Sequence, residues 1–277
     1  MTDIPLNPED VTKEWLKKTL EFSMKQNVKV LDLIPLKTAG YLSTACKASI
    51  QLDNEKIENI FLKITLPNND PFMAFINRYN VDTTEVIAYS EVLPQLIDFE
   101  KSYLKESRLE QAIPKFYAGG SNKSNQGFFL ILEDLSENFT MFDNGKGLDI
   151  KYVNWSMEEI AHYHAVSYAY GVKNGVKWNE KYPAIFPRFM EDQGLLDSVE
   201  ANLKLFEKDL EENEAPKDLI EKLSSFAKRY ISIIPKYIKV DESRFLIHGD
   251  YWSNNVMFGK ESKLAFIMKY FCSKMMK

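Results

Sequence analysis

The spacing of apolar side chains changes near the middle of this chain, and the change limits which folds it can adopt. Before about residue 133, apolar residues recur with the two-residue period of half-buried strands, as in 46–52. After that point they recur at helical spacing, as in 157–170 and 217–234. A strand-rich half followed by a helical half predicts an α+β fold of two lobes with a cleft between them.

Four strands and one helix are expected in the first half. The strands fall on residues 46–52, 60–64, 113–117 and 128–132. The helix spans about 83–96, and a turn rich in Gly, Asn and Ser covers 119–127. This half is therefore a mainly antiparallel N-lobe sheet with one inserted helix, preceded by a short helix near 10–22.

The two lobes are assigned as residues 1–134 for the N-lobe and 135–277 for a mainly helical C-lobe that includes a loop at 246–258. Within the C-lobe, one apolar stripe is expected to face the core. Its members are Ile160, Ala161, His164, Ala165 and Tyr168.

The segment 246–255 carries the strongest chemical signal. An apolar run precedes His248, Gly249 and Asp250, and Asn255 follows Asp250 by five positions. This is the spacing of a kinase catalytic loop, in which the Asp accepts the proton of a substrate hydroxyl and the Asn binds magnesium. Gly249 permits a tight turn. The alternative is a strand followed by an ordinary Asp-containing turn, with Trp252 buried.

Two residues of the first half can complete such a site. Lys63 lies in a strand among apolar neighbours, where a lysine can reach nucleotide phosphates. Glu85 lies on the following helix, shares a face with Tyr89, and can fix the direction of Lys63. The alternatives are an exposed strand lysine and a solvated glutamate, with Glu91 as a competitor.

The remaining candidates for nucleotide binding are weaker. Gly40 lies in the turn between two expected strands, where backbone N–H groups and the hydroxyl of Ser43 can contact phosphate, although an ordinary hairpin turn explains the pattern equally well. Residues 129–135 lead into the lobe connection, where main-chain groups hold adenine. Glu133 and Leu135 are therefore candidates, but the acids there can also be plain solvated linker residues.

Composition excludes several classes of protein. The net charge of −5 and the lack of a Lys/Arg block argue against a nucleic-acid partner. Cys46 and Cys272 are too few for a disulfide framework, and no apolar run approaches the roughly 20 residues that span a bilayer. The N-terminus has no signal peptide. We therefore expect a cytoplasmic protein with no membrane partner.

His162 and His164 are two apart on a helix, which argues against a zinc pair.

In five segments the chain resembles the ecdysteroid kinase-like family, relatives of choline kinases and aminoglycoside phosphotransferases. The segments, in the family's order, are 60–64, 85–94, 130–135, 160–165 and 248–255. The resemblance implies a bilobal protein-kinase-like fold and ATP-dependent phosphorylation of a small-molecule hydroxyl, on a steroid-like or choline-like alcohol. It also implies that Asp250 is the base, that Asn255 binds Mg²⁺ and that Lys63 contacts phosphates.

The chain departs from the family after the loop. The family continues with a strand that ends in a second metal-binding Asp, whereas 264–267 resembles that strand and Met268 follows it. The helices that complete the C-lobe are also missing, so the lobe is expected to be incomplete and C-terminally truncated. Three interpretations stay open: a kinase active only in an extended form, a non-catalytic nucleotide-binding or interaction module (a pseudokinase or fragment), and an unrelated α+β domain.

Overall fold

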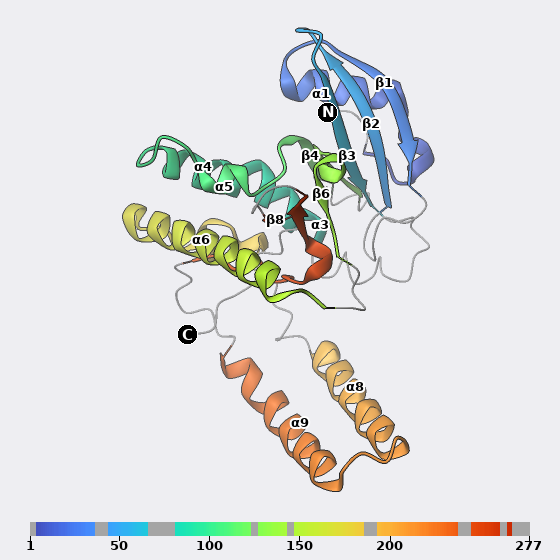
Figure 1. The fold of residues 1–277 in the computed structure, drawn as a ribbon, viewed down its shortest axis with the longest axis vertical. Coiled ribbons are helices and arrows are strands. Elements are labelled where there is room, and N and C mark those ends of the chain that lie inside the picture. Colours follow the sequence, from blue (N-terminus) through green and yellow to red (C-terminus); the bar gives the residue numbers. More distant parts are fainter. Residues whose placement is uncertain are drawn as a thin grey trace.

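The chain folds into an antiparallel sheet, a central group of helices and a separate two-helix hairpin (Figure 1). The computed structural model describes residues 4–36, 44–65, 81–122, 127–142, 147–185, 193–237, 245–260 and 265–267. The α+β class and the kinase-like arrangement expected from the sequence are confirmed. The lobe boundary at 134/135 stays a prediction.

The first half forms one five-stranded antiparallel sheet with the order β1-β2-β3-β5-β4. Its strands are β1 Val28–Pro35, β2 Thr44–Leu52, β3 Ile57–Ile64, β4 Phe116–Asn122 and β5 Gly127–Glu133. Helix α1 (Lys13–Met24) begins at Thr12, whose side chain accepts a hydrogen bond from the Trp15 N–H. The buried Leu16 and Leu20 of α1 pack on one face of the sheet.

The turn predicted at 119–127 is wrong at its start, because Gly119 and Gly120 belong to β4 and pair with Leu130 and Phe129. A Cβ atom on Gly119 would lie 3.0 Å from the Phe116 ring, and one on Gly120 would lie 3.0 Å from the Phe129 ring. The glycines therefore make room for aromatic rings within a strand.

The inserted helix is longer than predicted. It runs from α3 (Val81–Ile87) through a π-helical segment (Ala88–Val92) into α4 (Leu93–Lys101), and a short helix α5 (Arg108–Gln111) follows. Pro94 near the start of α4 has no N–H to donate to the preceding turn, which accounts for the local widening.

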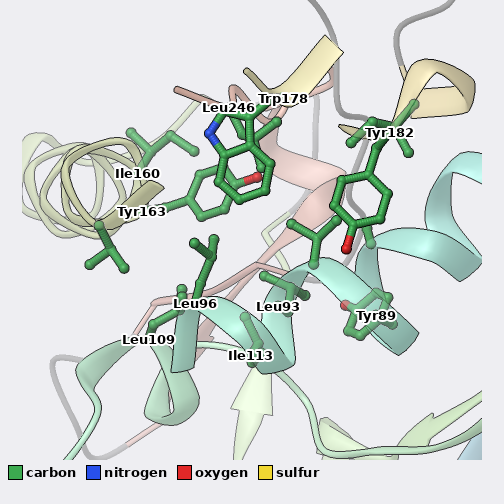
Figure 2. Close-up of a cluster of buried hydrophobic side chains, with 14 of the residues drawn as sticks. Tyr89, Leu93, Leu96, Leu109, Ile113, Ile160, Tyr163, Trp178, Tyr182 and Leu246 are labelled. Atoms are coloured by element: carbon green, nitrogen blue, oxygen red, sulfur yellow. The ribbon is translucent and has the colours of Figure 1, made fainter. Parts of the chain in front are cut away.

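One apolar core joins this helix to the second half of the chain. Tyr89, Leu93 and Leu96 pack with residues of α6 (Ile150–Asn174) and α7 (Trp178–Lys181), as Figure 2 shows. Leu246, the first residue of the predicted catalytic loop, belongs to the same core. The helix that carries Glu85 and the strand-to-loop segment at 246 are therefore fixed to a common body.

The expected stripe on α6 is only partly correct. Ile160 is buried, but Ala161, Ala165 and Tyr168 are exposed. Other residues form most of the side of the helix that faces the core. These are Ser156, Glu159, Tyr163, Val166, Ser167 and Gly171. Hydrophobic spacing missed this side because it includes polar groups, and tertiary partners satisfy two of them: Glu159 binds Arg108, and the Ser167 hydroxyl accepts the Leu246 N–H.

Two further parts complete the second half. Helices α8 (Gln193–Glu212) and α9 (Lys217–Tyr237) form a hairpin that lies apart from the sheet in Figure 1. Strand β7 (Val256–Gly259) pairs with β6 (Phe139–Thr140) and β8 (Ala265–Ile267). The strand predicted at 264–267 is thus confirmed over its last three residues. Among the described helices, none combines the length and apolarity that a membrane span requires.

Acidification should weaken the sheet through Glu58. Partial burial alone would raise the pKa of this β3 carboxyl, but hydrogen bonds from Lys56, Tyr117 and Lys115 outweigh burial and lower it from 4.5 to about 2. A depressed carboxyl pKa stabilises the fold fully above pH 4.5, and this contribution is lost as the pH falls toward 2. In urea denaturation at pH 7 and pH 3, Glu58→Gln should therefore show a smaller loss of stability than the wild type. An equal loss in both proteins would contradict this assignment.

Candidate active site

Lys63 and Glu85 form a buried ion pair that joins the sheet to the inserted helix. The Lys63 Nζ lies 2.6 Å from Glu85 Oε1 and 2.5 Å from Glu85 Oε2, and the two residues are 9% and 5% exposed. Lys63 occupies the middle of the sheet, in register with Ala45 on β2 and Leu130 on β5. Both alternatives for these residues, an exposed strand lysine and a solvated helix glutamate, are wrong.

The catalytic-loop candidate forms a closed, internally bonded turn. Gly249 has φ = 80°, a conformation that favours glycine, and the Asp250 N–H donates to His248 Nδ1 at 3.2 Å. Asn255 Nδ2 donates to the main-chain oxygen of Asp250 at 2.7 Å and to its Oδ2 at 2.8 Å. Asp250 and Asn255 are therefore held side by side, as the five-residue spacing predicted.

Two hydrogen bonds attach this loop to helix α6. The Tyr251 hydroxyl donates to the Ser156 main-chain oxygen at 2.6 Å, and the Leu246 N–H donates to Ser167 Oγ at 3.1 Å. Burial raises the pKa of Tyr251 above its usual range, so the phenol stays protonated and can donate. Trp252 is 42% exposed, which contradicts the alternative in which it is simply buried.

Glu133 and Leu135, the two candidates near the end of β5, have different surroundings. The Glu133 carboxylate accepts the Lys115 N–H at 3.2 Å, so this side chain binds the backbone just before β4. Leu135 is buried and begins a short 3₁₀ turn, Leu135–Glu137. Within the described part of the chain, the Leu135 N–H donates to no protein acceptor. Gly40 and Ser43 lie outside the described residues.

Several charged contacts of the site region were missed at the level of sequence. Lys47 of β2 pairs with Asp134, and Lys260 binds the turn at 135–137. Arg108 of α5 forms a bidentate pair with Glu159 of α6. No local pattern signals these pairs, because each joins residues that are far apart in the chain.

The two histidines of α6 have separate roles. His162 Nε2 lies 2.7 Å from Glu100 Oε1 of α4, and thus connects two helices. His164 lies against the Phe245 ring, and burial lowers its pKa. His164 is thus half-buried, as a member of the stripe that was expected to face the core.

The donor set fits a magnesium ion only in part. Asp250 and Asn255 provide the hard oxygen atoms that Mg²⁺ prefers, and the Asn255 Oδ1 accepts no hydrogen bond from any described residue. At the next position where the family pattern places an Asp, the sequence has Met268, which lies outside the described residues. A thioether is a poor ligand for Mg²⁺. The described residues contain no cluster of three or more acidic, His or Cys side chains suited to a metal.

A lysine–glutamate pair between a sheet and its inserted helix, combined with an Asp–Asn loop on a helical body, defines the kinase-like fold. Within that class, the chain belongs to the ecdysteroid kinase-like family, whose model matches residues 37–269.

Among solved structures, the chain is similar to the apoenzyme of macrolide 2'-phosphotransferase MphH from Brachybacterium faecium. The identity is 14% and the TM-score 0.40, over 94% of this chain and 73% of that one. No curated protein matches the chain. Because the chain belongs to the family, the interpretation as an unrelated α+β domain is wrong.

Proposed function

We propose that this protein is an ATP-dependent phosphotransferase that phosphorylates a hydroxyl group of a small molecule. The observation that carries the proposal is the buried Lys63–Glu85 pair, which holds an ammonium group on the sheet while the Asp250–Asn255 loop is attached to the same core. A desolvated, pre-oriented cation is suited to the negative charge of nucleotide phosphates.

Each residue has a distinct part in this proposal. Lys63 binds phosphate oxygens, and Glu85 holds its ammonium group in place. The Leu135 N–H binds the base. Asp250 orients the acceptor hydroxyl and takes its proton as the new P–O bond forms. Bound Mg²⁺, held by Asn255, would offset phosphate charge.

Within the same proposal, the acceptor is a steroid-like or choline-like alcohol and the protein acts in the cytoplasm. The paucity of cysteines supports a reducing compartment, and the net charge of −5 argues against a nucleic-acid partner.

The test is isothermal titration of the protein with ATP, with and without MgCl₂, followed by phosphate transfer from radiolabelled ATP to a panel of alcohols. Binding with transfer supports the proposal. The presence of Met268 at the second Asp position favours one competitor, a nucleotide-binding module without turnover. ATP binding without transfer to any alcohol would support that competitor.

Asn255→Ala should reduce the gain in ATP affinity that Mg²⁺ provides by about tenfold, because an oxygen ligand is lost. The measurement is the ATP dissociation constant over a MgCl₂ titration. Asn213→Ala is a matched control, since Asn213 also donates to a main-chain oxygen of an aspartate but lies exposed at the end of α8. An unchanged magnesium dependence in Asn255→Ala would remove this residue from the metal site.

A further inference from the structure

The 3₁₀ turn Leu135–Glu137 is held from the N-terminal half of the chain by Lys47. The Lys47 Nζ lies 2.9 Å from Asp134 Oδ2 and 2.6 Å from Ser136 Oγ. Lys47 is on β2, 87 residues away from Asp134. This contact therefore depends on tertiary structure, and the function proposed above does not use it.

A second lysine holds the same turn from the C-terminal half. The Lys260 Nζ donates to the main-chain oxygens of Glu137 at 2.7 Å and Ser136 at 3.3 Å. The Lys260 N–H donates to the Asn138 oxygen at 3.0 Å. Because Lys260 follows β7 directly, the strand after the Asp250 loop is connected to the turn.

Asp134 links these contacts to the backbone of the turn. Its Oδ1 accepts the Ser136 N–H at 3.0 Å, and its own N–H donates to the Asn59 oxygen of β3 at 2.9 Å. Burial alone would raise the pKa of Asp134, but hydrogen bonds from Lys47 and Ser136 outweigh it and lower the pKa. The carboxylate is thus charged at neutral pH, and it both caps the turn and pairs with Lys47.

Lys47 lies on the same face of the sheet as Lys63. On β2 and β3, Lys47 is in register with Phe61, and Ala45 is in register with Lys63. Side chains two residues apart on a strand share a face, so Phe61 and Lys63 share one, and Lys47 lies opposite Phe61 on that same face. The Lys47 contact therefore lies on the face that carries the proposed phosphate-binding lysine.

We propose that Lys47 and Lys260 are positioning residues, which hold this turn so that the Leu135 N–H is presented to a purine base. The inference rests on the proposed function, since it requires a nucleotide. Binding of a base through a single main-chain donor depends on the orientation of that donor, and two lysine contacts from separate segments of the chain reduce the freedom of the turn before binding. Lys47 and Lys260 touch only protein, so their effect passes through Leu135.

The experiment measures two partial ligands, adenosine and inorganic tripolyphosphate, by competition against a fluorescent ADP analogue on the full chain. Lys47→Met should weaken adenosine binding about tenfold and leave tripolyphosphate binding unchanged. Lys63→Met should show the reverse pattern. Lys47→Arg, which keeps the charge, should restore most of the adenosine affinity.

Lys56→Met is the matched control, because Lys56 is an exposed lysine in the turn between β2 and β3, and its partner Glu58 retains Lys115. It should change neither affinity. Equal weakening of both ligands by Lys47→Met would indicate a general loss of structure and overturn the inference, as would unchanged adenosine binding.

Lys260→Met, at an exposed position, provides a second test should Lys47→Met fail to fold, and the same selective loss is expected. A wild-type chain that binds neither adenosine nor tripolyphosphate would overturn the proposed function, and this inference with it. If the wild-type chain binds both ligands but neither Lys47→Met nor Lys260→Met weakens adenosine binding selectively, the inference alone would be overturned.

Discussion

Lys63→Met should destabilise the protein by about 3–5 kcal/mol, because it leaves the Glu85 carboxylate buried without its cation. Glu85 is only 5% exposed and lies within 2.6 Å of the Lys63 ammonium. The same variant should weaken ATP binding by about tenfold to a hundredfold, the usual effect of losing a hydrogen bond to a charged group. Urea denaturation and calorimetric titration measure the two effects.

A double variant separates these two effects. Lys63→Met with Glu85→Leu removes both charges, so most of the lost stability should return while ATP binding stays weak. Lys29→Met is the matched control, since Lys29 is an exposed lysine on β1, at the edge of the same sheet, and should change stability by no more than about 0.5 kcal/mol. Recovery of ATP affinity in the double variant would show that Lys63 acts on the nucleotide only through the fold.

Asp250→Asn should lower the rate of phosphate transfer by about 10²–10⁴-fold, the usual contribution of a positioned general base. An amide keeps the shape of the side chain and an oxygen that can accept from Asn255 Nδ2, but it takes up no proton. ATP affinity should therefore change little. Single-turnover transfer from radiolabelled ATP, together with calorimetric binding, distinguishes lost chemistry from lost affinity.

Asp98→Asn is the control for this substitution, because Asp98 is an exposed aspartate on α4, away from the loop. Its transfer rate should equal that of the wild type. A transfer rate in Asp250→Asn within about threefold of the wild type would remove Asp250 from the role of base, since a general base contributes far more than that.

Much of the site follows from local sequence because its parts are short and locally bonded. The Asp250–Asn255 contact spans five residues, and Gly249 adopts the positive φ that its position indicated. Lys63 and Glu85 were found because a mid-strand lysine and a following helix have a known geometric relation. Their partnership is confirmed at 2.5–2.6 Å.

Other features could not be found in this way. The core-facing side of α6 includes Glu159 and Ser167, which hydrophobic spacing assigns to solvent. They are buried because Arg108 and the Leu246 N–H satisfy them, and those partners come from distant segments. The glycine pair in β4 resembles a turn in the sequence, because glycine alone does not distinguish a bend from a close approach of aromatic rings.

The sequence by itself determined the α+β class, the change from a strand-rich to a helical half, and the two close contacts Lys63–Glu85 and Asp250–Asn255. Those properties depend on period, spacing and residue chemistry, which are local. The tertiary structure decided which other charged groups meet: Lys47 with Asp134, Arg108 with Glu159, and Lys260 with the turn at 135–137. Ion pairs between distant segments form only once the shared core has brought their strands and helices together, and no short stretch of sequence records that packing.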